Sequence, residues 1–473
     1  MNKLKISSLR ASLAVVSLLI APHGSALAQA PASASSPGPQ PGVEPTIPPP
    51  IPVPSDPVPV QPAVASEPLV APTPPVAAEV PGAVSAAVPY PSPSTTLPAD
   101  QPSFAATAGK GLVATSADKR FQIGLRPRVQ LRTTLNKDEN SSQLMASVNT
   151  LRLTIAGYAL TEDLKYFIQF AFGPGDFDGN SSPIFDAYVE YTGVRDLNVK
   201  VGQFFTPFDR ARTIREFALQ FVDRQGVVRE FSLDRDVGIG FSSQDLFGLG
   251  GRLAYNLFIG GGDGRNRIAD TKNKYGPQTP GMLSVARLIV RPWGQFDDDQ
   301  EGDLARSAKP HMAIGGAGAY NLSTDRDKST FGNTYTLGTF NYAHAEADLV
   351  FKWHGFSLLS EFLYRKANKS ERSAMVAGQT VTERSRSGYG YFAQVGQMLT
   401  RVLELTARAE SLKGTDRALR EVARVSGRQV GGGLNVYLNG HAFKLQTDYF
   451  YVFSSNTFSH GAHVARLQLD ATF

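Results

Sequence analysis

The chain of 473 residues carries 47 lysines and arginines against 42 aspartates and glutamates, so its formal net charge is +5 at pH 7. It contains no cysteine, which excludes disulfides, a catalytic thiolate and a lipid-modified cysteine. After the N-terminal region, no stretch reaches the ~18 consecutive apolar residues of a membrane-spanning helix. Any membrane span is therefore expected to be a closed β-barrel, since its backbone polar groups must be paired within the protein.

Residues 1–28 are predicted to be a signal peptide. Basic side chains within the first ten positions precede an apolar run over residues 11–21, which is too short to span a bilayer as a helix. Residues 26–28 read Ala-Leu-Ala and provide an A-x-A cleavage site, so the mature chain is expected to begin at Gln29. Cleavage after Ala30 and retention of the segment as a membrane anchor are the alternatives.

Residues 29–109 are predicted to form a disordered, Pro/Ala-rich tether in the periplasm. Within them, residues 31–100 hold 22 of the chain's 32 prolines and no lysine or arginine. Proline removes backbone donors, so this composition favours an extended polyproline conformation over a helix or a sheet. One interpretation is a spacer that contacts peptidoglycan or another periplasmic partner through residues 31–100. The other is a solvated leader without a partner.

Over residues 110–473, apolar and polar residues alternate, as in strands that have one apolar and one wet face. In the first such segment, Phe121, Ile123 and Leu125 share one face, opposite Arg126. The alternation predicts an all-β domain, a transmembrane antiparallel barrel of sixteen strands, with fourteen or eighteen strands left open. The sixteen candidates are residues 121–132, 151–155, 164–172, 185–191, 197–201, 236–245, 251–260, 282–292, 310–320, 339–354, 356–366, 388–399, 402–411, 428–438, 442–453 and 463–473.

The most specific string in the chain is Val-Gly-Gln-Phe-Phe-Thr-Pro-Phe at residues 201–208. It is preceded by Leu-Arg-Leu-Thr-Ile-Ala-Gly at residues 151–157 and Asp-Ala-Tyr-Val-Glu-Tyr at residues 186–191, and followed by Arg-Asp-Val-Gly at residues 235–238. In order and spacing, these motifs resemble the phosphate-selective porin O and P family. The resemblance implies a sixteen-stranded, often trimeric porin of the Gram-negative outer membrane, with one loop folded into its lumen.

The connection over residues 207–236 would be that inward loop. Two interpretations of its charges remain open: an ion-paired network that holds the loop against the barrel wall, or a dedicated anion site at the constriction. Acidic residues accompany its arginines in similar number. The candidate constriction residues are Arg210, Arg212, Arg215, Arg224 and Arg229.

On the barrel wall, the alternation places more basic than acidic residues on the inward face. Such an excess raises the local concentration of anions in a tube with low-dielectric walls. Arginine suits phosphate because its planar fork can bond two oxygens at once. The alternative is a lumen of mixed sign that only keeps the wall wet. The candidate anion path comprises Arg126, Arg128, Arg132, Arg152, Lys165 and Lys200.

The predicted function is passive diffusion of small solutes through an outer-membrane channel, with a preference for anions such as phosphate or polyphosphate. The expected partners are outer-membrane lipid, small anions and further copies in a homotrimer. The class resemblance implies that Phe473, which ends the last alternating segment, is an assembly signal. Neither enzyme activity, a cofactor, a metal nor a nucleic acid is predicted. The alternative function is a barrel-anchored cell-wall or surface interaction protein that uses the Pro-rich segment.

Overall fold

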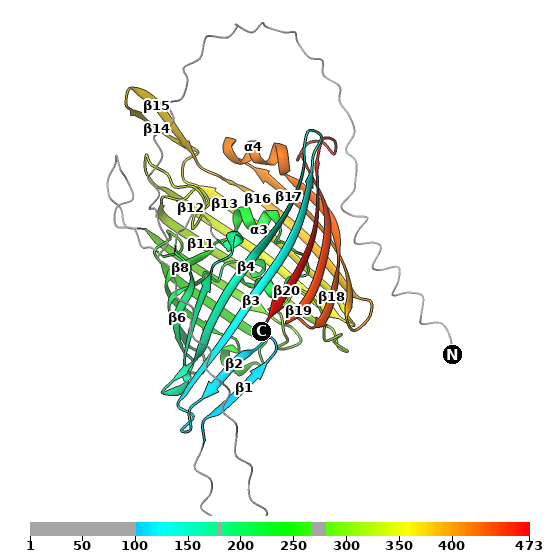
Figure 1. Ribbon diagram of the computed structural model, residues 1–473. Helices are drawn as coiled ribbons and strands as arrows, with labels where there is room; N and C mark the ends of the chain where they lie inside the picture. The colour runs from blue at the N-terminus through cyan, green and yellow to red at the C-terminus, as the bar shows by residue number, and fades with distance from the viewer. Residues whose placement is uncertain (1–100, 177–181, 267–280) are drawn as a thin grey trace, which may run out of the picture. The chain divides into compact units, whose positions relative to one another are not determined.

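A computed structural model describes residues 101–176, 182–266 and 281–473. Within these ranges, eighteen strands form one sheet, and sixteen of them close into an antiparallel barrel (Figure 1). The barrel closes where β20 (Ala462–Thr472) pairs with β3 (Phe121–Lys137). The other barrel strands are β4 (Ser142–Ala159), β5 (Thr161–Ala171), β6 (Ile184–Tyr191), β7 (Asn198–Phe205), β8 (Arg235–Ser243), β9 (Leu253–Gly260), β10 (Met282–Val290), β11 (His311–Thr324), β12 (Phe340–Trp353), β13 (Phe356–Ala367), β16 (Gly388–Met398), β17 (Leu403–Gly414), β18 (Arg428–Asn439) and β19 (Phe443–Phe453).

The predicted sixteen-stranded transmembrane barrel is confirmed, and each strand overlaps its predicted segment. The strands are polar inside and apolar outside. In β19, for example, Lys444, Gln446 and Asp448 are buried, whereas Leu445 and Tyr449 are exposed on the outer face. An apolar exterior around a polar interior is the arrangement that lipid outside and water inside require.

Connections at one end of the barrel are short, and those at the other end are long (Figure 1). At the short-turn end, residues 354–355 suffice to join β12 to β13, and β20 runs toward this end. At the opposite end, the long connections hold the helix α4 (Arg417–Ser426) and the hairpin of β14 (Glu371–Val376) and β15 (Gln379–Arg384), neither of which was predicted. No helix in the described ranges is long and apolar enough to cross a membrane.

A hairpin precedes the barrel. Its strands are β1 (Ser103–Thr107) and β2 (Gly111–Thr115), and β2 pairs with the beginning of β3, where Leu112 lies opposite Leu125. The predicted tether, residues 29–109, therefore extends too far at its C-terminal end, because Ser103–Thr107 form ladder hydrogen bonds that the proline content did not reveal. The predicted signal peptide and the rest of the tether, up to residue 100, lie outside the described residues.

Candidate anion path in the lumen

Residues 206–234, between β7 and β8, fold into the lumen, and we call them the constriction loop. Their first helix, α2 (Arg210–Thr213), begins where the Asp209 side chain accepts a hydrogen bond from the Arg212 amide at 2.6 Å. This bond satisfies one of the amides that a helix start leaves free. Further along, α3 (Gly226–Phe231) is buried, and Phe208 and Phe231 are fully enclosed. The loop thus builds an apolar core inside the barrel.

The constriction loop is fastened to the wall made by β12 to β19. Lys444 of that wall donates a hydrogen bond to the Leu219 carbonyl at 2.8 Å. Arg365, also on that wall, donates to the Glu230 carboxylate at 2.5 Å. Because these wall charges bind the loop, they do not face an open channel.

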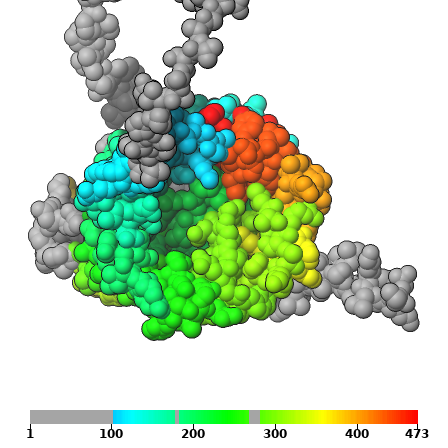
Figure 2. All heavy atoms as spheres, turned by 90° about the horizontal axis from the view of Figure 1, so that it is seen from below, coloured from blue at the N-terminus to red at the C-terminus, as the bar shows by residue number. Residues whose placement is uncertain are grey.

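A second segment, residues 291–310, enters the lumen from the short-turn end, and we call it the inner segment. Its Glu301 is buried and accepts a hydrogen bond from the Gln220 amide of the constriction loop at 2.6 Å. Its Asp298 pairs with Arg210 of the same loop at 2.9 Å. Seen from the short-turn end, the molecule is hollowed beside the yellow-green part of the chain, to which the inner segment belongs (Figure 2). The loop and the segment together close one side of the lumen.

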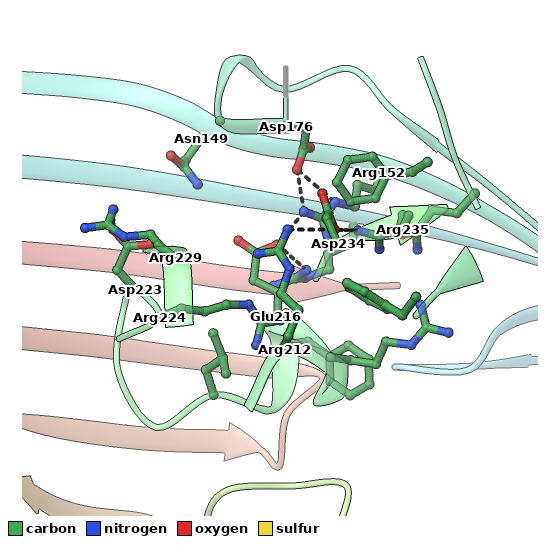
Figure 3. Close-up of a pocket in the computed structure, with 18 of the residues that line it drawn as sticks. Asn149, Arg152, Asp176, Arg212, Glu216, Asp223, Arg224, Arg229, Asp234 and Arg235 are labelled. Carbon is green, nitrogen blue, oxygen red and sulfur yellow. Dashed lines mark hydrogen bonds and ion pairs between the residues drawn. The ribbon is translucent and has the colours of Figure 1, made fainter. Parts of the chain in front are cut away.

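A cavity lies between the constriction loop and the wall made by β3 to β8. This upper cavity has a volume of about 470 Å³. Among the described residues, its lining holds ten arginines and one lysine but only four acidic residues, and side chains of the loop and of the wall meet around it (Figure 3). The basic residues are Arg126, Arg128, Arg132, Arg152, Arg212, Arg215, Arg224, Arg229, Arg235, Arg265 and Lys328, and the acidic ones are Asp176, Glu216, Asp223 and Asp234.

Of the six wall residues predicted to form the anion path, Arg126, Arg128, Arg132 and Arg152 line the upper cavity. Three of the four are already engaged. Arg128 makes a two-pronged pair with Asp470 on β20, at 2.9 and 2.7 Å. Arg132 donates to the side-chain oxygen of Gln468 at 2.9 Å, and Arg152 forms ion pairs with the Asp176 and Glu216 carboxylates.

Arg126 differs from its neighbours because it forms no ion pair within the described part of the chain. Its guanidinium carbon lies 5.9 Å from the centre of the Phe217 ring, and the side chain is part-buried. A cation in this position keeps its donors available to a solute. Among the four predicted wall residues that line the upper cavity, Arg126 is therefore the one whose charge no carboxylate of the described residues neutralises directly.

Lys165 and Lys200, the other two predicted wall residues, do not line the upper cavity. Lys200 lines a smaller lower cavity of about 290 Å³ toward the short-turn end, where it pairs with Glu190 at 3.3 Å. Lys165 is exposed on β5, opposite Glu190 in the register. The six residues thus do not form one continuous site.

Four of the five predicted constriction residues, Arg212, Arg215, Arg224 and Arg229, line the upper cavity. Arg224 donates to backbone carbonyls of its own loop, at 2.6 Å to that of Ile214. Burial, with the nearby charge of Arg212, lowers the pKa of Arg224 to about 10. The fifth residue, Arg210, is buried against acidic groups and belongs to the network that fastens the loop.

Sequence reasoning missed Arg235, Arg265 and Lys328 as lining residues. Arg235 lies in the Arg-Asp-Val-Gly motif and was counted only among the charges of the loop, although β8 starts with it. Its guanidinium lies between two rings, 3.8 Å from the centre of Phe185 and 3.7 Å from that of Phe205. The other two come from long connections between later strands, and no local pattern indicates where such connections fold.

Two of the acidic groups of the upper cavity, Glu216 and Asp234, are held ionised. Burial by itself would raise the pKa of Glu216, but the guanidinium groups of Arg152 and Arg128 outweigh it and hold this pKa well below its usual range. The pKa of Asp234 is likewise lowered, because Arg212 and Arg235 outweigh the effect of burial. Each carboxylate therefore neutralises part of the arginine charge at neutral pH.

Three buried carboxylates, Glu346, Asp348 and Glu361, lie close enough together to hold a metal ion. Arg287 forms ion pairs with two of them, Glu346 and Asp348, and Arg210 pairs with Asp348 at 2.5 Å. Two of the three carboxylates are therefore already paired with guanidinium groups. The cluster is thus part of the wall network that holds the constriction loop.

No protein-family model matches this sequence, and no curated protein is significantly similar to it. Three solved structures are similar in fold at TM-scores of 0.45, 0.46 and 0.45. They are the outer membrane channel DcaP of Acinetobacter baumannii, OmpF of Salmonella typhi in complex with daunomycin, and an anion-selective porin from Comamonas acidovorans. DcaP is 13% identical in sequence, and the match covers 75% of this chain and 97% of that one. OmpF is 12% identical, with 75% of this chain and 98% of that one covered. The anion-selective porin is 12% identical, with 74% of this chain and 99% of that one covered.

Proposed function

We propose that the protein is an outer-membrane porin that lets small solutes diffuse passively and prefers anions. One observation carries the proposal: eleven basic residues line the upper cavity against four acidic ones. In a lumen with low-dielectric walls, this excess raises the local concentration of anions and repels cations. Phosphate and polyphosphate are the anions that suit the site best, because arginine forks can bond two of their oxygens at once.

The apolar outer face supports a location in a membrane. Short turns lie at one end of the barrel, the arrangement of the periplasmic end in outer-membrane barrels. We therefore propose that the short-turn end faces the periplasm of a Gram-negative cell and that the protein assembles as a homotrimer. Residues 1–28 would direct export, and residues 29–100 would form the periplasmic tether. Phe473, whose amide donates to the Pro127 carbonyl at 3.0 Å, would act as the assembly signal.

The test is the conductance of the purified protein in a planar bilayer under a KCl gradient. The expected reversal potential has the sign of an anion-preferring channel, and added phosphate should reduce the chloride current. A cation-preferring reversal potential would overturn the anion preference. Purified barrel that inserts without producing steps of conductance would overturn the channel itself.

A further inference from the structure

Two cavities of the lumen share part of their lining. The upper cavity, of about 470 Å³, lies beside the constriction loop, and the lower cavity, of about 290 Å³, lies toward the short-turn end. Among the described residues, only Phe205 and Arg215 line both. A solute that crosses from one cavity to the other therefore passes these two side chains, and Arg215 is the charged one.

Arg215 is held more loosely than Arg235, with which it shares a carboxylate. Its single ion pair is with Asp186 at 3.3 Å, and its side chain is 35% exposed. By contrast, Arg235 binds the same carboxylate at 2.8 and 3.2 Å and is only 3% exposed. The Arg215 guanidinium lies 4.9 Å from the centre of the Phe167 ring and 5.8 Å from that of Phe205, so aromatic faces would still contact the cation if it left Asp186.

Because Asp186 is shared with Arg235, the free-energy cost of moving Arg215 away from it is small. When Arg215 leaves Asp186, the two bonds from Arg235 remain, so Asp186 is not left as an unpaired buried charge. An unpaired buried charge is what makes the breaking of an enclosed ion pair costly. An anion can therefore replace Asp186 as the partner of Arg215, and Asp186 can replace the anion again when it leaves.

We propose that Arg215 is the transfer residue of the channel: it takes an anion from the upper cavity and releases it into the lower one, where Lys200 lines the wall. This inference rests on the proposed anion preference. The class of solute is a small anion with two or more oxygens on one centre, such as inorganic phosphate, because the guanidinium fork binds that geometry at two points.

The experiment compares wild type with Arg215→Gln, Arg215→Lys and the matched control Arg229→Gln. Arg229 belongs to the same loop and is 58% exposed. Of the upper and lower cavities it lines only the upper one, so it does not stand at the neck between them. Reversal potential in a KCl gradient and block of chloride current by inorganic phosphate are measured for each. Removal of one charge at the neck should weaken phosphate block and chloride preference by about tenfold in Arg215→Gln, and by less than about twofold in the control.

Arg215→Lys keeps the charge but loses the fork, so it should retain chloride preference while phosphate block weakens. If Arg215→Gln and Arg229→Gln change both quantities equally, Arg215 is not the transfer residue. If Arg215→Gln raises conductance without changing selectivity, the side chain is only a steric obstacle, and the inference also fails. A wild-type channel that prefers cations would instead refute the proposed function. Differential migration of heated and unheated samples on a denaturing gel checks that every variant folds.

Discussion

Replacing Glu216 by glutamine should strengthen the anion preference of the channel. Glu216 is 19% exposed and faces the upper cavity, where it pairs with Arg152 at 2.5 Å and with Arg128 at 3.5 Å. Each of these arginines keeps a second carboxylate, Asp176 or Asp470 respectively. The substitution therefore removes a negative charge from the cavity without leaving an arginine unpaired.

The size of the effect follows from Coulomb's law. A unit charge about 6 Å from a permeating anion, at an effective dielectric constant of about 20, is worth about 3 kcal/mol. Salt screens charges over about 8 Å at physiological ionic strength, and the cavity is hydrated, so we expect roughly half of that energy. About 1.4 kcal/mol corresponds to about a tenfold stronger phosphate block. The loss of stability should stay within about 1–3 kcal/mol, because the amide can still accept a hydrogen bond from an arginine.

Planar-bilayer recordings at matched protein insertion provide the assay, with phosphate titrated into a chloride solution. Glu371→Gln is the control: it makes the same change of charge on the β14–β15 hairpin, where the carboxylate is 58% exposed and lies outside both cavities. Phosphate block that is unchanged or weaker in Glu216→Gln, or an equal gain in Glu371→Gln, would show that this cavity does not set the selectivity.

Three further outcomes are expected. Arg126→Gln should lower chloride preference and leave the denaturation temperature of the barrel nearly unchanged. Arg128→Gln should cost about 3–5 kcal/mol of stability, because the buried Asp470 carboxylate loses its ion pair and keeps only the hydrogen bond from Gln130. Thermal melting followed by circular dichroism separates the two variants. Glu301→Leu leaves two buried donors of the constriction loop, the Gln220 amide and the Gln225 side chain, without this partner, at about 1–3 kcal/mol each. Single-channel currents should become noisier and proteolysis of the loop faster. The pKa values of Glu216 and Asp234 are lowered from 4.5 and 3.8, so the stability that these ionised groups contribute should be complete at pH 7 and be lost only as the pH falls below those values. Thermal melting followed by circular dichroism along a pH series measures this loss.

The barrel could be predicted from the sequence because its signal is local. Side chains alternate between the two faces of a strand, so Lys444 points inward and Leu445 outward independently of the rest of the chain. The same two-residue period indicates every strand of the barrel. It also places Arg126, Arg128 and Arg132 on one face of β3. This period does not reveal a strand whose two faces differ little in polarity. Ser103–Thr107 is such a strand, and it was therefore not predicted.

The sequence does not predict which charged side chains of the lumen are paired, because their partners come from distant parts of the chain. Arg128 pairs with a carboxylate 342 positions away, and Arg365 with one 135 positions away. Strand alternation gives the face of a residue but not its neighbour across the lumen. The inner segment escaped prediction for the same reason, since its acidic run of Asp297, Asp298 and Asp299 has the composition of an exposed turn.

In the proposed channel, selectivity depends on which charges the constriction loop neutralises, rather than on the sum of charges around the lumen. On the wall from β12 to β19, basic and acidic side chains alike bind the loop, as Lys444 binds the Leu219 carbonyl and Asp448 the Val222 amide. That wall therefore contributes little field to a passing solute, whatever its composition. On the opposite wall the loop brings arginines of its own toward those of β3 and β4, and the acidic groups there are too few to neutralise them. The loop thus turns a barrel of mixed charge into a channel with one strongly basic side.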